Sequence, residues 1–209
     1  MNLVFDFGAV LFKWQPAQIV ASRFPAMAAT PEAAQHLARS IFSHDDWHAF
    51  DRGTMPMDVV VQRTSQRLSL PHADLQGLVS GLGDVLTPIE ETVAVLAALE
   101  ARRGPRGELP HLKLYFLSNM PEPIARVLEQ RHAFLNWFDG GIFSGDVKLI
   151  KPEPAIYTLL ESRYALDPGC TVFIDDLKVN VEAARARNWH GIHFESATQL
   201  AADLKTHCL

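Results

Sequence analysis

The sequence predicts an α/β fold with a parallel sheet, and two observations support this prediction. Short apolar runs rich in β-branched and aromatic residues recur along the chain, and between them apolar residues repeat at helical spacing. Strands that alternate with helices need crossover connections, which place helices on both faces of a parallel sheet. A Rossmann-like architecture is therefore expected.

Five strands and four helices make up this alternating part. The expected strands are residues 3–7, 112–117, 141–143, 171–174 and 191–194. The expected helices between them are residues 89–102, 123–131, 154–164 and 179–188. These elements together predict one core domain built around the sheet.

The alternation stops between residues 14 and 87, a stretch that is expected to be wholly helical. Candidate helices are residues 16–24, 33–42, 46–50 and 57–68, and their bulky apolar residues should form a small core (Leu37, Ile41, Val60 and Leu68). We therefore expect a helical domain of residues 14–87 inserted into a core domain of residues 1–13 and 88–209.

Composition and charge exclude several classes of protein. A hydrophobic content of 48% with 21% charged residues is ordinary for a globular protein of 209 residues. The formal net charge of −5 offers no basic surface, so no nucleic-acid partner is expected. Two cysteines make no disulfide framework, and no apolar run reaches the roughly 18 residues of a membrane span. We expect a cytoplasmic protein with no membrane partner, and the sequence leaves its oligomeric state open.

Asp6 is the first candidate catalytic residue, because it lies at the C-terminal end of the first expected strand. Ligands of open α/β sheets bind at that end of the strands. A carboxylate there can attack phosphorus and form an aspartyl-phosphate, which splits hydrolysis into two easier steps. Taken alone, an aspartate before a glycine also suits an ordinary turn, so Asp6 gains meaning only from the motifs that follow.

Ser118 and Asn119 follow the second expected strand and precede a helix. The Ser118 hydroxyl and the Asn119 backbone amide are candidates to bind a phosphoryl oxygen, as helix N-termini readily do. A serine at this position also serves as a helix cap, and both roles can hold together.

Lys151 opens the helix of residues 154–164, where the helix dipole disfavours a cation. Its position therefore indicates an anion nearby, and we expect Lys151 to neutralise a phosphate and the Asp6 carboxylate. Lys148 is the alternative, although it is better explained as a surface charge.

Asp175 and Asp176 end the fourth expected strand as an adjacent acidic pair. Two such carboxylates repel each other unless a cation or a proton lies between them. Hard oxygen ligands suit Mg²⁺, which also bridges to phosphate oxygens. We expect one direct and one outer ligand and favour Asp176 as the direct one, with Asn180 orienting the loop.

His44 and His48 have the i, i+4 spacing of the HExxH zinc motif. Aspartate replaces the glutamate of that motif, and no third ligand is evident. The preferred interpretation is that the two histidines lie on one face of a helix and do not bind zinc. The glycine turn after this helix, at residues 51–53, is expected to point back toward the core.

Four motifs, in this order and of this kind, resemble those of the haloacid dehalogenase-like (HAD) hydrolase superfamily. They are the motifs that contain Asp6, Ser118, Lys151 and the pair Asp175–Asp176. Within the superfamily, the chain is most similar to the α-D-glucose-1-phosphate phosphatase branch and to the phosphatase domains of epoxide hydrolases. The segments that carry this similarity are FDFGAVL, LSNMP, KPEPAIY, FIDDLKVNVEAARARNWHGI and DRG. The resemblance implies a HAD core with a helical C1-type cap that selects the substrate. It also implies Mg²⁺-dependent hydrolysis, through Asp6, of small phosphorylated metabolites such as glucose-1-phosphate.

The sequence departs from the superfamily at Gly8, where most HAD phosphatases carry a second aspartate that protonates the leaving group. The Gly8 carbonyl can still bind Mg²⁺ beside Asp6, Asp175 and Asp176. Losing a general acid typically costs about 10²–10⁴ in rate. Water, His48 or Asp51 could supply the proton. A sugar-1-phosphate depends less on such a proton, because an anomeric hydroxyl is more acidic than an ordinary alcohol and leaves more easily. Arg52 either contacts the far part of the substrate or is solvated.

Two other functions remain open. A 2-haloacid dehalogenase also uses an aspartate nucleophile and lacks the second aspartate, but it needs no metal and has no use for the pair Asp175–Asp176. The other is a binding protein that keeps the fold and has lost turnover with Gly8.

Overall fold

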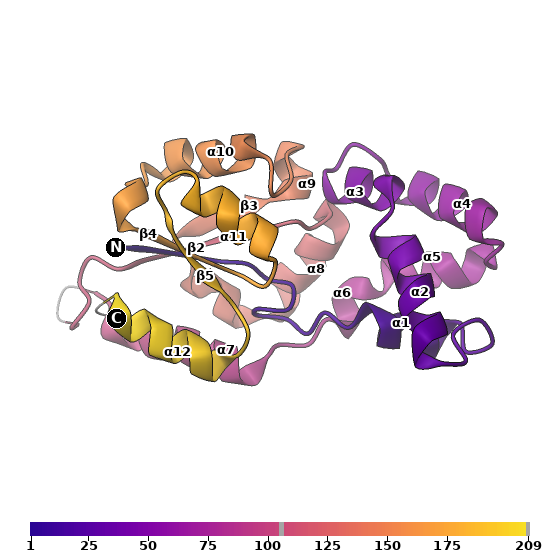
Figure 1. The fold of residues 1–209 in the computed structure, drawn as a ribbon, viewed down its shortest axis with the longest axis horizontal. Helices are drawn as coiled ribbons and strands as arrows, with labels where there is room; N and C mark the ends of the chain where they lie inside the picture. Colours follow the sequence, from indigo (N-terminus) through magenta and orange to yellow (C-terminus); the bar gives the residue numbers. More distant parts are fainter. Residues whose placement is uncertain (105–106, 208–209) are drawn as a thin grey trace.

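The computed structural model describes residues 1–104 and 107–207, and it confirms the α/β fold. Five parallel strands form one sheet in the order β3-β2-β1-β4-β5, with helices on both faces (Figure 1). The strands are β1 (Asn2–Phe5), β2 (Lys113–Ser118), β3 (Gly140–Phe143), β4 (Thr171–Asp175) and β5 (His190–His193). The order reverses on either side of β1, and ligands of open α/β sheets bind at such a point.

Alternation along β1 explains why both faces of the sheet are covered. Leu3 and Phe5 point into one apolar cluster, and Val4 points into a second cluster on the opposite face. The first face packs against α7 (Glu90–Arg102), α8 (Glu122–Arg131) and α12 (Ala197–Thr206), and the second against α10 (Pro154–Tyr164) and α11 (Lys178–Arg185). Short elements complete this part of the chain: η1 (Ala133–Trp137), α9 (Ser144–Val147) and η2 (Pro168–Cys170).

The strand register places the chemistry at one edge of the sheet. Phe5 lies opposite Phe116 of β2 and Ile174 of β4. The residues that follow these positions therefore come together at the C-terminal edge, among them Asp6, whose amide donates to the Ile174 carbonyl at 2.9 Å.

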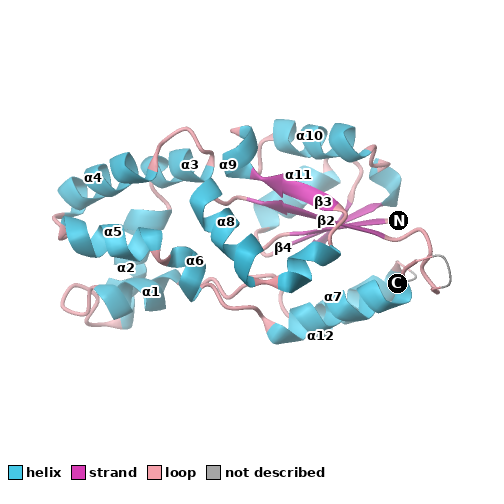
Figure 2. Cartoon of the chain, turned by 180° about the vertical axis from the view of Figure 1, so that it is seen from behind, coloured by secondary structure: helices cyan, strands magenta, loops and turns pink. Residues whose placement is uncertain are grey.

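Between β1 and α7 the described chain forms helices and contributes no strand to the sheet. These helices pack together beyond the C-terminal edge of the sheet (Figures 1 and 2), and the term helical segment is used below for residues 16–85. They are α1 (Pro16–Arg23), α2 (Pro31–Phe42), α3 (Asp45–Asp51), α4 (Met57–Leu68), α5 (His72–Ser80) and α6 (Leu82–Val85). As expected, Leu37, Ile41 and Val60 are buried and Leu68 packs against the same cluster.

The chain enters and leaves the helical segment through two adjacent connections. The Lys13 amide donates to the Thr87 carbonyl and the Ile89 amide donates to the Leu11 carbonyl, both at 2.8 Å. These two hydrogen bonds hold the connections side by side where the segment joins the sheet.

A second contact joins the end of α3 to the start of α9. Gly53 has a φ of +75°, and a Cβ added there would lie 2.3 Å from the Gly145 carbonyl oxygen. Beside it, the Arg52 guanidinium pairs with both carboxylate oxygens of Glu153, at 2.8 and 2.5 Å. The glycine turn therefore does approach the core, as its sequence predicts.

Several boundaries differ from those expected. The first strand ends at Phe5 and not at residue 7, because the Phe7 carbonyl accepts from the Leu11 and Phe12 amides and the chain turns there. Four helices were not expected from the sequence, namely α5, α6, α9 and α12. The two helices α5 and α6 have no side-chain N-cap, and α9 has only four residues, so their local signals are weak.

Within residues 1–104 and 107–207, no helix combines the length and the apolar character needed to cross a bilayer.

Candidate active site

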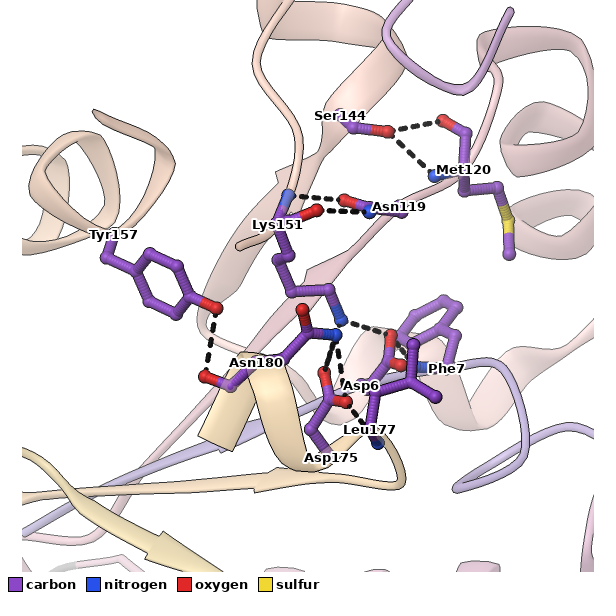
Figure 3. A network of polar contacts seen from close by, with 10 residues as sticks. All are labelled: Asp6, Phe7, Asn119, Met120, Ser144, Lys151, Tyr157, Asp175, Leu177 and Asn180. Atoms are coloured by element: carbon purple, nitrogen blue, oxygen red, sulfur yellow. Dashed lines mark hydrogen bonds and ion pairs between the residues drawn. The ribbon is translucent and has the colours of Figure 1, made fainter. Parts of the chain in front are cut away.

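Three buried charged side chains meet at the C-terminal edge of the sheet (Figure 3). The Lys151 Nζ lies 2.8 Å from Oδ1 of Asp6 and 2.7 Å from Oδ2 of Asp175. Exposed fractions are 3% for Lys151, 7% for Asp6 and 0% for Asp175. Buried charges are stable only when they are paired, so the Lys151 ammonium needs a carboxylate beside it, and both Asp6 and Asp175 lie within reach.

Asn119 fixes the backbone of Lys151. Its side-chain Nδ2 donates to the Lys151 carbonyl at 3.0 Å, and the Lys151 amide donates to its Oδ1 at 2.8 Å (Figure 3). This double contact holds the lysine against the end of β2. The sequence predicts a role only for the backbone amide of Asn119, so this contact of its side chain is an additional finding.

Asp175 has its two carboxylate oxygens occupied within the protein. Oδ1 accepts from the Leu177 amide at 2.8 Å and from Asn180 Nδ2 at 3.0 Å, while Oδ2 accepts from Lys151 and, at 3.1 Å, from Asn180. Asn180 therefore orients this loop, as expected. Asp176 instead lines the cavity above the cluster, and Asp175 does not.

Asp6, Asp175 and Asp176 are suited to hold a divalent metal ion. One carboxylate oxygen from each lies within 4.8 Å of the others, and the described residues contain no other such group of three. Burial raises the pKa of Asp6 to about 7, helped by repulsion from Asp175 and Asp176 and opposed by Lys151. Burial and repulsion from Asp175 also raise the pKa of Asp176 to about 6. A bound cation would offset this repulsion between the carboxylates, so the three oxygen donors fit a hard metal ion.

Lys151 supplies positive charge without a metal. Burial alone would lower the pKa of Lys151, but attraction to Asp175 and Asp6 outweighs it and raises the pKa. The lysine therefore carries its charge at neutral pH and can neutralise an anion at this edge of the sheet.

A cavity of about 550 Å³ lies over the cluster, between the sheet edge and the helical segment. Its lining includes nine of the residues singled out in the sequence, namely Asp6, Gly8, His48, Asp51, Ser118, Asn119, Lys151, Asp176 and Asn180. Asp51 lies on the side of the helical segment, and burial raises its pKa well above the ordinary range. Two distant parts of the sequence thus share one concave site.

Arg52 and His44 are not brought to this cavity. The Arg52 guanidinium pairs instead with both carboxylate oxygens of Glu153, outside the lining of the cavity. The Nδ1 of His44 accepts from the Asp46 amide at 3.1 Å and caps α3. His48, by contrast, is exposed and lines the cavity, whereas His44 does not line it.

Ser144 is a positioning residue that was not expected from the sequence. Its buried Oγ accepts from the Met120 amide at 2.8 Å and donates to the Asp51 carbonyl at 2.5 Å. It therefore links the end of β3 to α3 and helps to place Asp51. No local signal marks this serine, because its partners are distant in sequence.

The parallel sheet, the buried lysine and the acidic cluster together define a candidate active site at the C-terminal edge of an α/β fold. The family model for haloacid dehalogenase-like hydrolases matches residues 16–187, and the chain belongs to that family. The family assigned from the four motifs is thereby confirmed, together with the hydrolase class.

Relatives include phosphatases. The sesquiterpene phosphatase astK of Aspergillus oryzae is 23% identical over 202 residues, covering 97% of this chain and 93% of the relative. A phosphorylated carbohydrates phosphatase of Thermotoga maritima is 32% identical over 98 residues, covering 47% of this chain and 43% of the relative.

Solved structures support the fold. A HAD family enzyme of Bacteroides thetaiotaomicron, in complex with magnesium and inorganic phosphate, is similar with a TM-score of 0.72 and 17% identity. The match covers 95% of this chain and 98% of that enzyme.

Proposed function

We propose that this protein is a Mg²⁺-dependent phosphomonoester hydrolase that acts on small phosphorylated metabolites. The observation that carries the proposal is the Asp6 carboxylate, paired at 2.8 Å with a buried lysine at the floor of the cavity. A phosphatase relative that spans nearly the whole chain supports it further.

Asp6 is the proposed nucleophile. Its Oδ1 accepts from the Phe7 amide at 2.7 Å and from Lys151, so we assign the attack on phosphorus to Oδ2. The new Oδ2–P bond forms as the ester O–P bond breaks and the alcohol leaves. Water then hydrolyses the aspartyl-phosphate, which releases phosphate and restores Asp6.

Ser118, the Asn119 amide and Lys151 are the proposed ligands of the phosphoryl oxygens. Mg²⁺ would be held by Asp6, Asp176 and the Gly8 carbonyl, with Asp175 as an outer ligand. When bound, the ion would neutralise charge on the phosphoryl group and its ligands.

We further propose that residues 14–87 form a C1-type cap domain on a core of residues 1–13 and 88–209. The adjacent connections at Lys13–Thr87 and Leu11–Ile89 support this division, because they let the segment close over the site as one unit. Closure would exclude water from the cavity during the first chemical step.

Asp51 is the proposed proton donor in place of the aspartate missing at Gly8. It lines the cavity, and burial favours its protonated form. We expect Asp51→Asn to reduce the rate on hexyl phosphate, whose alkoxide leaves poorly without a proton, by about 10²–10⁴-fold. The rate on p-nitrophenyl phosphate should change little, since nitrophenolate leaves without a proton.

The comparison between the two esters, measured as kcat in steady-state assays, decides this assignment. His48→Gln is the matched control, because His48 lines the same cavity from α3. If His48→Gln gives the leaving-group-dependent loss and Asp51→Asn does not, the proton comes from His48.

The function itself is tested by phosphate release from a panel of phosphomonoesters, with glucose-1-phosphate included, in Mg²⁺ and then in EDTA. We expect release that depends on Mg²⁺. Absence of release from every ester would contradict the proposal. Chloride release from 2-haloacids would then indicate a dehalogenase, and its absence a binding protein.

A further inference from the structure

The part of the cavity away from the acidic cluster has an apolar wall. Apart from the residues at the sheet edge, the buried side chains that line it are hydrocarbon, aromatic or thioether groups. They come from the helical segment and from the start of α8: Ala38, Phe42, Trp47, Leu82, Leu86, Met120, Pro121 and Ile124. The half-buried Trp14 and Ala17 continue the wall.

Three of these residues form a continuous aromatic surface. The rings of Trp14 and Phe42 lie 5.1 Å apart at 72°, and those of Phe42 and Trp47 lie 4.7 Å apart at 89°. Edge-to-face contacts of this kind favour a defined arrangement of the rings. The wall therefore presents a preformed apolar surface to a ligand.

Most polar side chains that the helical segment contributes to the cavity lining are exposed to solvent. Gln35, Arg39, Ser43 and His48 line the cavity but are exposed. Further in, that segment adds the Asp51 carboxyl and the indole N–H of Trp47, which is engaged by Asp51. A ligand with several hydroxyl groups needs several convergent polar partners inside its site, because an unpaired buried hydroxyl is costly. This interior does not supply them for a sugar.

We propose that the substrate is the phosphate monoester of an apolar alcohol, with its phosphate at Asp6 and Lys151 and its hydrocarbon part along the wall of Trp14, Phe42 and Trp47. This inference rests on the proposed phosphatase function and narrows its substrate class. The volume of about 550 Å³ suits such a ligand, since sites for small molecules span roughly 300–1,000 Å³.

Binding of n-alkyl phosphonates tests the inference without turnover, because the reaction does not cleave their P–C bond. We expect the Kd, measured by titration calorimetry with Mg²⁺, to fall by up to about fourfold per added methylene from ethyl toward decyl. A Kd that does not change with chain length would overturn the inference. Tighter binding of glucose-1-phosphate than of the octyl compound would overturn it as well.

Ala17→Phe locates the apolar wall. The added ring should fill part of the cavity, so that the Kd stops improving at a shorter chain while ethyl phosphonate binds as to the wild type. Ala21→Phe is the matched control, because Ala21 lies one turn further along α1, is similarly half-buried and does not line the cavity. Equal chain-length profiles for the two variants would contradict the placement.

A second pair serves if either α1 variant fails to fold, as judged by circular dichroism. Leu177 is 53% exposed and lines the cavity, whereas Val179 is 58% exposed and does not. We expect Leu177→Gln to weaken binding of the longer phosphonates severalfold and Val179→Gln to leave it unchanged. Equal binding to both would oppose the inference.

Phosphate release from the matching alkyl phosphates separates the two proposals. Chain-length-dependent binding without any release would reject the phosphatase and keep the apolar site. Release that is faster from glucose-1-phosphate than from every alkyl phosphate, together with Kd values that do not vary with chain length, would reject the apolar site and keep the phosphatase.

Discussion

Replacing Asp6 with asparagine is expected to lower kcat for phosphate release by about 10⁴-fold or more, as removal of a nucleophile typically does. The amide that replaces the carboxylate is too weak a nucleophile to form the acyl phosphate. The assay is phosphate release from the best ester of the panel. Retained activity would remove Asp6 as the nucleophile.

The same change should leave the fold intact. Burial raises the pKa of Asp6 to about 7, which means that its ionised form is disfavoured in the folded protein. The neutral amide avoids that penalty, and Lys151 keeps Asp175 as a partner at 2.7 Å. We therefore expect a Tm, measured without metal at neutral pH, that equals or exceeds that of the wild type. Asp58→Asn, at an exposed carboxylate in the first turn of α4, is the control for activity and Tm.

The sequence was sufficient to predict the residues that meet at the sheet edge. Asp6 and Asp175 end neighbouring parallel strands, so the fold class alone brings them together. Lys151 was predicted from a conflict with the helix dipole, and the two carboxylates within 2.8 Å of it account for its position. Strand order and helix electrostatics are local or topological properties, and a single sequence displays them.

The identity of the cavity wall could not be predicted in this way. Asp51 and Arg52 are consecutive, and successive helical residues point in directions about 100° apart. One lines the cavity while the other pairs with Glu153, and only the docking of the segment decides which. Phe42 and Ile41 likewise look equally suited to a helical core, although only Phe42 reaches the cavity. These outcomes depend on tertiary packing, which periodicity does not specify.

Replacing Asp175 or Asp176 with alanine is expected to have different effects, on stability in the first case and on metal binding in the second. Asp175→Ala should lower the free energy of unfolding by about 3–5 kcal/mol, because removing one partner of a buried ion pair leaves the other uncompensated. Lys151 would keep only Asp6, and the buried Asn180 Nδ2 would lose its acceptor. The measurement is urea unfolding at neutral pH without metal.

Asp176→Ala should instead keep the stability and lose the response to metal. Asp176 is partly exposed toward the cavity, and burial and the neighbouring Asp175 already disfavour its charge, as the raised pKa of about 6 indicates. A bound ion raises the Tm by mass action on the folded state, so the wild-type Tm should rise with Mg²⁺ and the Asp176→Ala Tm should not. Equal losses of stability in the two variants would contradict the assignment of Asp175 as the structural carboxylate. A Tm of Asp176→Ala that still rises with Mg²⁺ as in the wild type would contradict the assignment of Asp176 as a metal ligand.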